Sequence, residues 1–210
     1  MKKIIVSVAL LFGLNLQADK VHDGYVAYKY KDYKLARVIW DESCSSGNLS
    51  ACYNLAQIYS NGLGTHYNEL KAAKLYNKVC KSGTDARACT NLGILLENGV
   101  GGVHKDYYTA SKMYLKGCDG GDVNGCFNLG TSYYKGRGVI RDLPLASAIY
   151  EDTCKHGHVY GCYNAAKMQK DGKGIRKNES KAKQLFAKAC NMGHHSACRK
   201  YERLDEDGVK

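Results

Sequence analysis

The chain has little of several features that define common protein classes. Its 210 residues include one proline, and no apolar stretch after residues 4–14 approaches the length of a membrane helix. No cysteine precedes Cys44, so no lipid-anchored N-terminal cysteine is indicated. No long run of basic residues occurs, although 31 Lys and Arg stand against 20 Asp and Glu. These absences argue against a membrane span and against a concentrated basic tail.

The first residues instead resemble an export signal. Lys2 and Lys3 precede the apolar run 4–14, and Leu16-Gln17-Ala18 supplies a small residue at a cleavage point. The sequence therefore predicts a signal peptide over residues 1–18 and a secreted or periplasmic mature chain, in a compartment where disulfides persist.

The charge balance is basic but dispersed. The formal net charge of +11 falls to +9 without Lys2 and Lys3, because 29 basic residues then face 20 acidic ones. A basic surface favours anionic partners such as cell-wall polymers or acidic host proteins, whereas dispersed charge favours an ordinary solvated surface. Nucleic acid is not an expected partner of an exported chain.

Ten cysteines form five sequence pairs that recur every 36 to 38 residues, which is the most informative pattern in the chain. The pairs are Cys44 with Cys52, Cys80 with Cys89, Cys118 with Cys126, Cys154 with Cys162, and Cys190 with Cys198. A fixed period of this length is typical of a helical solenoid, in which each repeat buries its apolar face against its neighbours.

Positions around the first cysteine of each pair predict a helix. An alanine lies eight residues before it, an aromatic residue four before it and a glycine three after it. Alanine, aromatic and cysteine at i, i+4 and i+8 share one stripe of an α-helix. The glycines suit the left-handed conformation that ends such a helix: Gly47, Gly83, Gly121, Gly157 and Gly193.

The second cysteine opens another helix, which ends at a Gly-x-Gly turn. The only proline, Pro144, falls in the first turn of a predicted helix, where its missing N–H costs nothing. The predicted fold is therefore an all-α, right-handed α/α solenoid over residues 19–210. Its repeats are expected at about 50–86, 87–124, 125–160 and 161–196, with an N-terminal half-repeat at 19–49 and a C-terminal cap at 197–210.

Ten cysteines allow many disulfide connectivities, which sequence alone does not exclude. The nearest-neighbour pairing is favoured because one cysteine ends a helix and the next begins the antiparallel one, so their Cβ atoms can approach. The extra residue between Cys80 and Cys89 is expected to bulge the loop without breaking the pair.

These repeats resemble the Sel1-like family, a relative of the tetratricopeptide fold, and within it the Helicobacter cysteine-rich proteins. The resemblance rests on Gly125-Cys126-Phe127-Asn128-Leu129-Gly130 with Tyr133, Gly136, Gly138 and Val139, and on Lys71-Ala72 with Tyr76 and Cys80. It implies a secreted or periplasmic protein. Members of the family are described as proteins that bind penicillin-like compounds, often labelled β-lactamases, or as factors that interact with a host. The resemblance also implies a monomeric scaffold that holds a peptide, a peptidoglycan fragment or a host protein in a concave groove.

The residues offer little support for hydrolysis of β-lactams. The Ser-x-x-Lys strings Ser132–Lys135 and Ser180–Lys183 are about as many as chance predicts, and neither Ser-Asp-Asn nor Lys-Thr-Gly occurs. Ser132 also aligns with packed apolar positions of the other repeats. The catalytic residues of any such activity are therefore unknown from sequence.

Metal or cofactor chemistry is not expected either. His156, His158, His194 and His195 fall in the cysteine-bracketed loops, where exposed histidines without a metal are the favoured interpretation. Cysteine cannot act as a nucleophile if all ten are bridged.

An asparagine two residues after the second cysteine recurs as Asn54, Asn91, Asn128 and Asn164. A row of amides offers donors and acceptors to a peptide backbone or an acyl-amide, which makes these four the candidate ligand-binding residues. The alternative is that each amide bridges to a neighbouring repeat.

Overall fold

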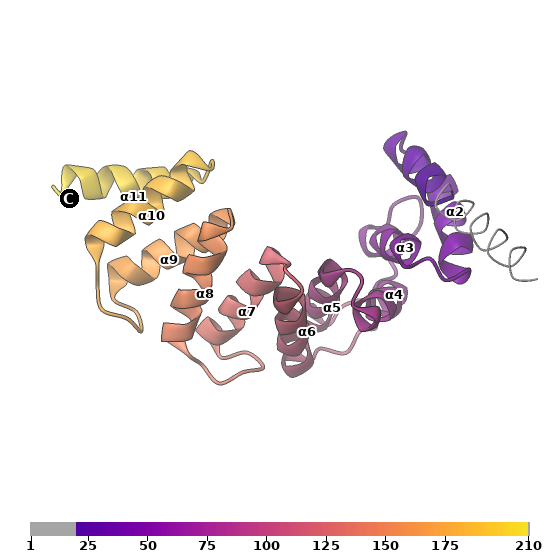
Figure 1. The fold of residues 1–210 in the computed structure, drawn as a ribbon, viewed down its shortest axis with the longest axis horizontal. Helices are drawn as coiled ribbons and strands as arrows, with labels where there is room; N and C mark the ends of the chain where they lie inside the picture. Colours follow the sequence, from indigo (N-terminus) through magenta and orange to yellow (C-terminus); the bar gives the residue numbers. More distant parts are fainter. Residues whose placement is uncertain (1–19, 210) are drawn as a thin grey trace, which may run out of the picture. The chain divides into compact units, whose positions relative to one another are not determined.

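The computed structural model describes residues 20–209 (Figure 1). The predicted signal peptide, residues 1–18, lies outside the described residues, as do Asp19 and Lys210. Residues 20–209 are all-helical, with turns and no strand. None of the helices among them has both the length and the apolar character of a membrane span.

The chain divides into two compact units, one up to Lys105 and one from Asp106 onward. Unit one contains the helical residues 20–29 and then α2 (Tyr33–Ser45), α3 (Leu49–Asn61), α4 (Glu69–Ser82) and α5 (Ala86–Asn98). Consecutive helices pack against one another, α2 on α3, α3 on α4 and α4 on α5. The sequence suggested one stack of repeats. The contacts of such an array run between neighbouring helices, so no single core needs to span the whole chain.

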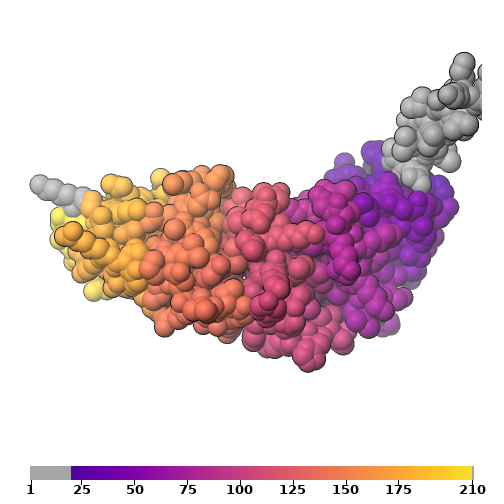
Figure 2. Space-filling view, turned by 60° about the horizontal axis from the view of Figure 1, so that its bottom comes forward, coloured from indigo at the N-terminus to yellow at the C-terminus, as the bar shows by residue number. Residues whose placement is uncertain are grey.

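Unit two contains α6 (Tyr107–Asp119), α7 (Val123–Lys135), α8 (Leu143–Lys155), α9 (Val159–Asp171), α10 (Glu179–Asn191) and α11 (His195–Glu206). Each helix again packs on the next one in the sequence, and the space-filling surface of this unit follows the same order from magenta to yellow (Figure 2). The all-α repeat architecture predicted from the cysteine period is thus confirmed.

The predicted helix stripe is buried as expected. The alanines eight residues before each first cysteine, Ala36, Ala72, Ala110, Ala146 and Ala182, are at most 1% exposed, and the aromatic residues four before it are at most 2% exposed. Alanine at this position lets a neighbouring helix approach closely, while the aromatic ring supplies a large buried apolar surface.

Each complete helix begins at a polar N-cap whose side chain accepts a backbone N–H from its first turn. Eight of these caps are Asp or Asn, and the caps of α9 and α11 are His158 and His194. Such caps stabilise a helix by about 1 kcal/mol relative to alanine. Pro144 lies in the first turn of α8, as predicted.

The Gly-x-Gly turns depend on glycine for two reasons. Gly136 ends α7 in the left-handed region at φ 67°, and Gly138 has φ 70°. A Cβ on Gly138 would also collide with the backbone carbonyl of Tyr107 at the start of α6. The backbone of the turn therefore lies directly against the start of α6.

All five cysteine pairs form disulfides with the expected nearest partner, and none of the ten cysteines is free. The bonds join Cys44 to Cys52, Cys80 to Cys89, Cys118 to Cys126, Cys154 to Cys162, and Cys190 to Cys198. Their Cα–Cα distances are 4.4 to 4.7 Å. Each bond joins the end of one helix to the first turn of the next across a short loop. The five glycines after the first cysteine all have positive φ, as predicted.

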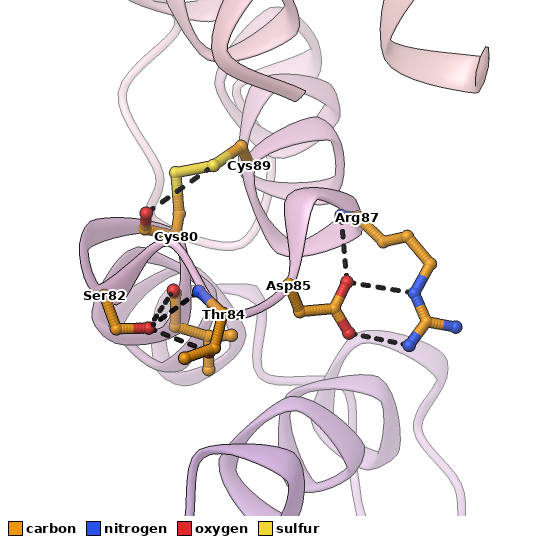
Figure 3. The surroundings of a disulfide bond; sticks show 7 residues. Cys80, Ser82, Thr84, Asp85, Arg87 and Cys89 are labelled. Carbon is orange, nitrogen blue, oxygen red and sulfur yellow. Dashed lines mark hydrogen bonds and ion pairs between the residues drawn. A yellow bond between two sulfur atoms is a disulfide. The ribbon is translucent and has the colours of Figure 1, made fainter. Parts of the chain in front are cut away.

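The loop between Cys80 and Cys89 carries one extra residue, Thr84, between Gly83 and the N-cap Asp85 (Figure 3). In the other four loops the N-cap N–H donates to the carbonyl just before the first cysteine. Here the Ser82 hydroxyl donates to that carbonyl, Val79 O, at 2.6 Å, and Thr84 N–H donates to Ser82 Oγ at 3.4 Å. The predicted bulge is confirmed, and the disulfide is retained.

We expect the purified, oxidised protein to contain no free thiol. Titration of the denatured protein should read near zero, and peptide mapping should link each cysteine to its nearest partner. The double change Cys80→Ser and Cys89→Ser should lower the unfolding free energy by about 2–3 kcal/mol, because a closed loop of roughly 9 residues restricts the unfolded chain. A Cys52–Cys80 link would contradict this pairing.

The His158 cap makes stability depend on pH. Its Nδ1 accepts Gly161 N–H at 3.0 Å, which requires the neutral imidazole. Burial lowers the pKa of His158, and Asp122 opposes this shift. The native state therefore binds fewer protons, so this stability is present above the unfolded pKa of about 6.5 and is lost as pH falls from there through the lower folded pKa.

His158→Asn keeps a cap acceptor that does not titrate, so it should flatten the loss of stability between about pH 7 and 5 in urea unfolding. The exposed His66, changed to Asn, serves as the control and should leave the pH profile unchanged. An unaltered profile in His158→Asn would show that the cap does not couple to protons.

Candidate functional site

Neither Ser-x-x-Lys string is arranged for nucleophilic attack. Ser132 is 6% exposed, and its hydroxyl donates to Asn128 O at 3.1 Å, as the packed position predicted. Ser180 is exposed in the first turn of α10, but Lys183 Nζ pairs with Asp205 Oδ1 at 2.7 Å. The lysine that would activate Ser180 therefore forms an ion pair with a residue of α11 instead.

The loop histidines have separate partners. His156 Nδ1 lies 2.9 Å from Asp152 O, whereas His158 and His194 cap the helices that follow them. Within residues 20–209 no group of three His, Cys, Asp or Glu side chains is placed to hold a metal. The interpretation of all four as exposed loop residues was wrong for His158 and His194, which are half-buried caps.

The asparagine row is half-buried and partly engaged within the protein. Asn91 Nδ2 donates to Tyr53 Oη at 3.3 Å and also hydrogen-bonds to Tyr76. Asn164 bonds in the same way to Tyr150. Burial raises the pKa of both Tyr76 and Tyr150, and these hydrogen bonds only partly offset that effect. We call the helix at the start of a repeat, which holds the second cysteine of a pair, the first helix (α3, α5, α7, α9 and α11), and the helix that follows it the second helix (α4, α6, α8 and α10). Asn91 and Asn164 thus bridge a first helix to a tyrosine on the second helix before it.

A continuous set of ring contacts crosses unit two from α7 to α11, and we call it the ring ladder: Phe127, His158, Tyr160, His194 and Tyr163. Phe127 stacks on His158 with centroids 4.2 Å apart, and Tyr163 stacks on His194 at 4.2 Å. Tyr160 joins the two stacks, 6.2 Å from His158 and 5.4 Å from His194. Each N-cap histidine therefore lies on the aromatic ring of the preceding repeat.

The ladder is anchored on one side and open on the other. Phe127 contacts Tyr150 at 5.6 Å and Tyr163 contacts Phe186 at 5.8 Å, and both of these core rings are at most 2% exposed. Tyr160, in contrast, is 61% exposed. The result is a rigid aromatic surface with an accessible edge.

Unit one has a related arrangement at the same position of the repeat. Tyr53 contacts Tyr76 edge-to-face at 5.7 Å, and the Arg87 guanidinium lies 4.7 Å from the Tyr53 ring centroid. Asp85 holds Arg87 through two hydrogen bonds, of 3.0 and 2.6 Å (Figure 3). In both units, a side chain at the start of the first helix of one repeat covers an aromatic ring on the first helix of the repeat before it.

Sequence reasoning missed this feature, although a signal for it was present. The residue directly after the second cysteine is Tyr53, Phe127 or Tyr163 in three of the repeats. The role of this aromatic residue depends on which side chain of the next loop packs against it. That packing is a tertiary contact, which the sequence pattern does not show.

A model of the Sel1 repeat matches four consecutive segments, residues 49–84, 86–122, 123–158 and 159–194. Each segment begins at the first residue of α3, α5, α7 or α9. No curated protein matches the chain.

Several solved structures are similar. A protective antigen of uropathogenic Escherichia coli with an SLR fold has a TM-score of 0.87 at 24% identity, covering 92% of this chain and 42% of its own. A Sel1 repeat protein of Oxalobacter formigenes has a TM-score of 0.79 at 25% identity, covering 88% and 76%. Helicobacter pylori cysteine rich protein B is 30% identical, with a TM-score of 0.49, covering 61% and 91%.

The chain thus spans less than half the length of the Escherichia coli antigen. The four matched segments, in contrast, make up more than half of this chain and coincide with its helical repeats. The chain belongs to the Sel1 repeat family.

Proposed function

We propose that this protein is an exported binding scaffold that holds a peptide, a peptidoglycan fragment or a segment of a host protein on the first helices of its repeats. The observation that supports the proposal is the ring ladder of unit two, which offers exposed aromatic surface on a fixed backbone. Such a surface serves recognition, and no chemistry is required of it.

Rigidity makes the ladder suited to binding. Tyrosine supplies a large contact area with few rotatable bonds, so little conformational entropy is lost when a ligand covers it. Phe127 and Tyr163 are already held between a core ring and a cap histidine. A preorganised surface of this kind avoids part of the ordering cost of association.

The asparagines take a supporting part in the proposal. Asn128 and Asn164 directly follow the ladder residues Phe127 and Tyr163 in the sequence. An amide has two N–H donors and an acceptor oxygen, so a bond to a tyrosine hydroxyl leaves capacity for a peptide group. We place the ligand backbone along this row and its side chains on the rings.

Export is supported by the predicted signal peptide and by five disulfides, which persist in oxidising compartments. Hydrolysis of β-lactams, the alternative implied by the resemblance, has less support. Ser132 and Lys183, which that chemistry would need, are engaged with Asn128 and Asp205.

Replacing Tyr160 with alanine tests the ladder. Wild-type protein is first screened by calorimetry against muropeptides, a peptide library, a penicillin and a cephalosporin. For each ligand found, Tyr160→Ala should weaken affinity by about tenfold, or about 1.4 kcal/mol. It should change stability by less than about 0.5 kcal/mol, because the side chain is exposed.

The matched control is Tyr108→Ala, since Tyr108 lies on the second helix α6 of the same unit and is 60% exposed. This variant should bind as the wild type does. Equal affinities in the two variants would show that the ladder is not the binding surface.

Asn91→Ala separates bridging from ligand binding. If the amide supports Tyr53 and Tyr76, its loss should lower the unfolding free energy by about 1–3 kcal/mol, because the hydroxyls of two buried tyrosines lose a partner. Asn98→Ala, at the exposed end of the same helix, should cost less than about 0.5 kcal/mol. Unchanged stability together with lost affinity would assign the amide to the ligand instead.

A further inference from the structure

The cations of α11 lie on one side of that helix. At about 100° per residue, Arg199, Lys200 and Arg203 fall within an arc of about 100°, whereas Glu202, Asp205 and Glu206 fall within a different arc of similar width. The core-facing residues Ala197 and Leu204 lie on a third side and are at most 2% exposed. The helix therefore presents a cationic side, an acidic side and a buried side.

The cationic side of α11 matches the ladder side of α9. Counted from the second cysteine of each pair, Arg199, Lys200 and Arg203 occupy the positions of Tyr163, Asn164 and Lys167. Lys167 Nζ lies 5.8 Å from the centroid of the Tyr163 ring, so a cation already borders the ladder on α9. The corresponding positions of α7 carry no charge.

Charge thus rises along the first helices of unit two, from none on α7 to one cation on α9 and three on α11. None of these positions carries a carboxylate. Lys167, Arg199 and Arg203 are exposed, and Arg199 Nη2 donates to Ser196 Oγ at 3.1 Å. On the acidic side of α11, Asp205 pairs with Lys183 at 2.7 Å, away from the ladder.

We propose that unit two binds an acidic peptide, with aromatic or aliphatic side chains on the ring ladder and Asp or Glu side chains on Lys167, Arg199, Lys200 and Arg203. This inference rests on the proposed function, whose ligand class it narrows. Arg presents a planar fork of donors that matches a carboxylate, and the order of rings and cations fixes the direction of the ligand. The net charge of +9 on the chain without Lys2 and Lys3 favours the approach of such a ligand.

The test uses two fluorescein-labelled peptides of ten residues. Both begin with two tyrosines; one continues with four Asp and Glu residues, and its twin has Asn and Gln at those places. Fluorescence anisotropy on the oxidised full-length mature protein should show at least tenfold tighter binding of the acidic peptide in low salt. The preference should shrink as ionic strength rises, because exposed charges are screened.

The double change Arg199→Gln and Arg203→Gln should abolish the preference, so that the acidic peptide and its neutral twin bind the variant with similar affinity. The charge-matched control is Lys155→Gln with Lys188→Gln, two exposed lysines on the second helices α8 and α10. That control should retain the preference, and melting curves confirm that both double variants are folded.

The outcomes separate this inference from the proposed function. If both peptides bind equally and Tyr160→Ala weakens both, the scaffold function stands and the acidic preference is wrong. If the acidic peptide does not bind at about 1 mM, or keeps its preference in the double variant of Arg199 and Arg203, the inference is overturned. If polygalacturonate displaces the acidic peptide while neutral dextran does not, and binds more tightly than the peptide, the cationic side serves anionic glycans, and the peptide proposal fails.

Discussion

The structure depends on one constraint, the disulfide that ties the end of each second helix to the first turn of the next first helix. A loop of three residues and a Cα–Cα distance of 4.4 to 4.7 Å leave little freedom between the two helices. A repeat has no core of its own, because its apolar stripe is buried only against neighbours. The covalent link fixes the register in which that burial takes place, and the alanines of the stripe let the helices close together.

The same short loops connect the fold to the surface that we propose for binding. Each loop ends at an N-cap, and in unit two the caps His158 and His194 also stack on the rings Phe127 and Tyr163. One side chain thus satisfies a helix terminus, covers an aromatic ring of the preceding repeat and extends the ladder. Helix capping, repeat packing and surface chemistry are consequently coupled, so that protonating His158 acts on all three.

The asparagine and serine positions show that a residue which recurs or matches a motif need not have a catalytic or binding role. Two amides of the asparagine row, those of Asn91 and Asn164, bond to tyrosine hydroxyls on another helix. Ser132 and Ser180 match a catalytic string in sequence but lie in different environments, one packed against its own helix and one exposed. A residue that recurs in every repeat is therefore explained first by packing. Residues that break the pattern, such as the cations of α11, are where we propose that binding preference arises.

The sequence alone determined the repeat length, the helical class and the glycine turns, and it favoured the nearest-neighbour disulfide pairing without excluding the other connectivities. Those features are local, since they depend on periodicity, on left-handed glycines and on cysteines 8 or 9 residues apart. Only the tertiary structure decided what a side chain on one repeat meets on the next. The stacking of His158 on Phe127 joins residues 31 positions apart, and the ion pair between Lys183 and Asp205 joins residues 22 positions apart. Periodicity does not encode such contacts, because they depend on how closely two helices pack and on which rotamers that packing leaves open.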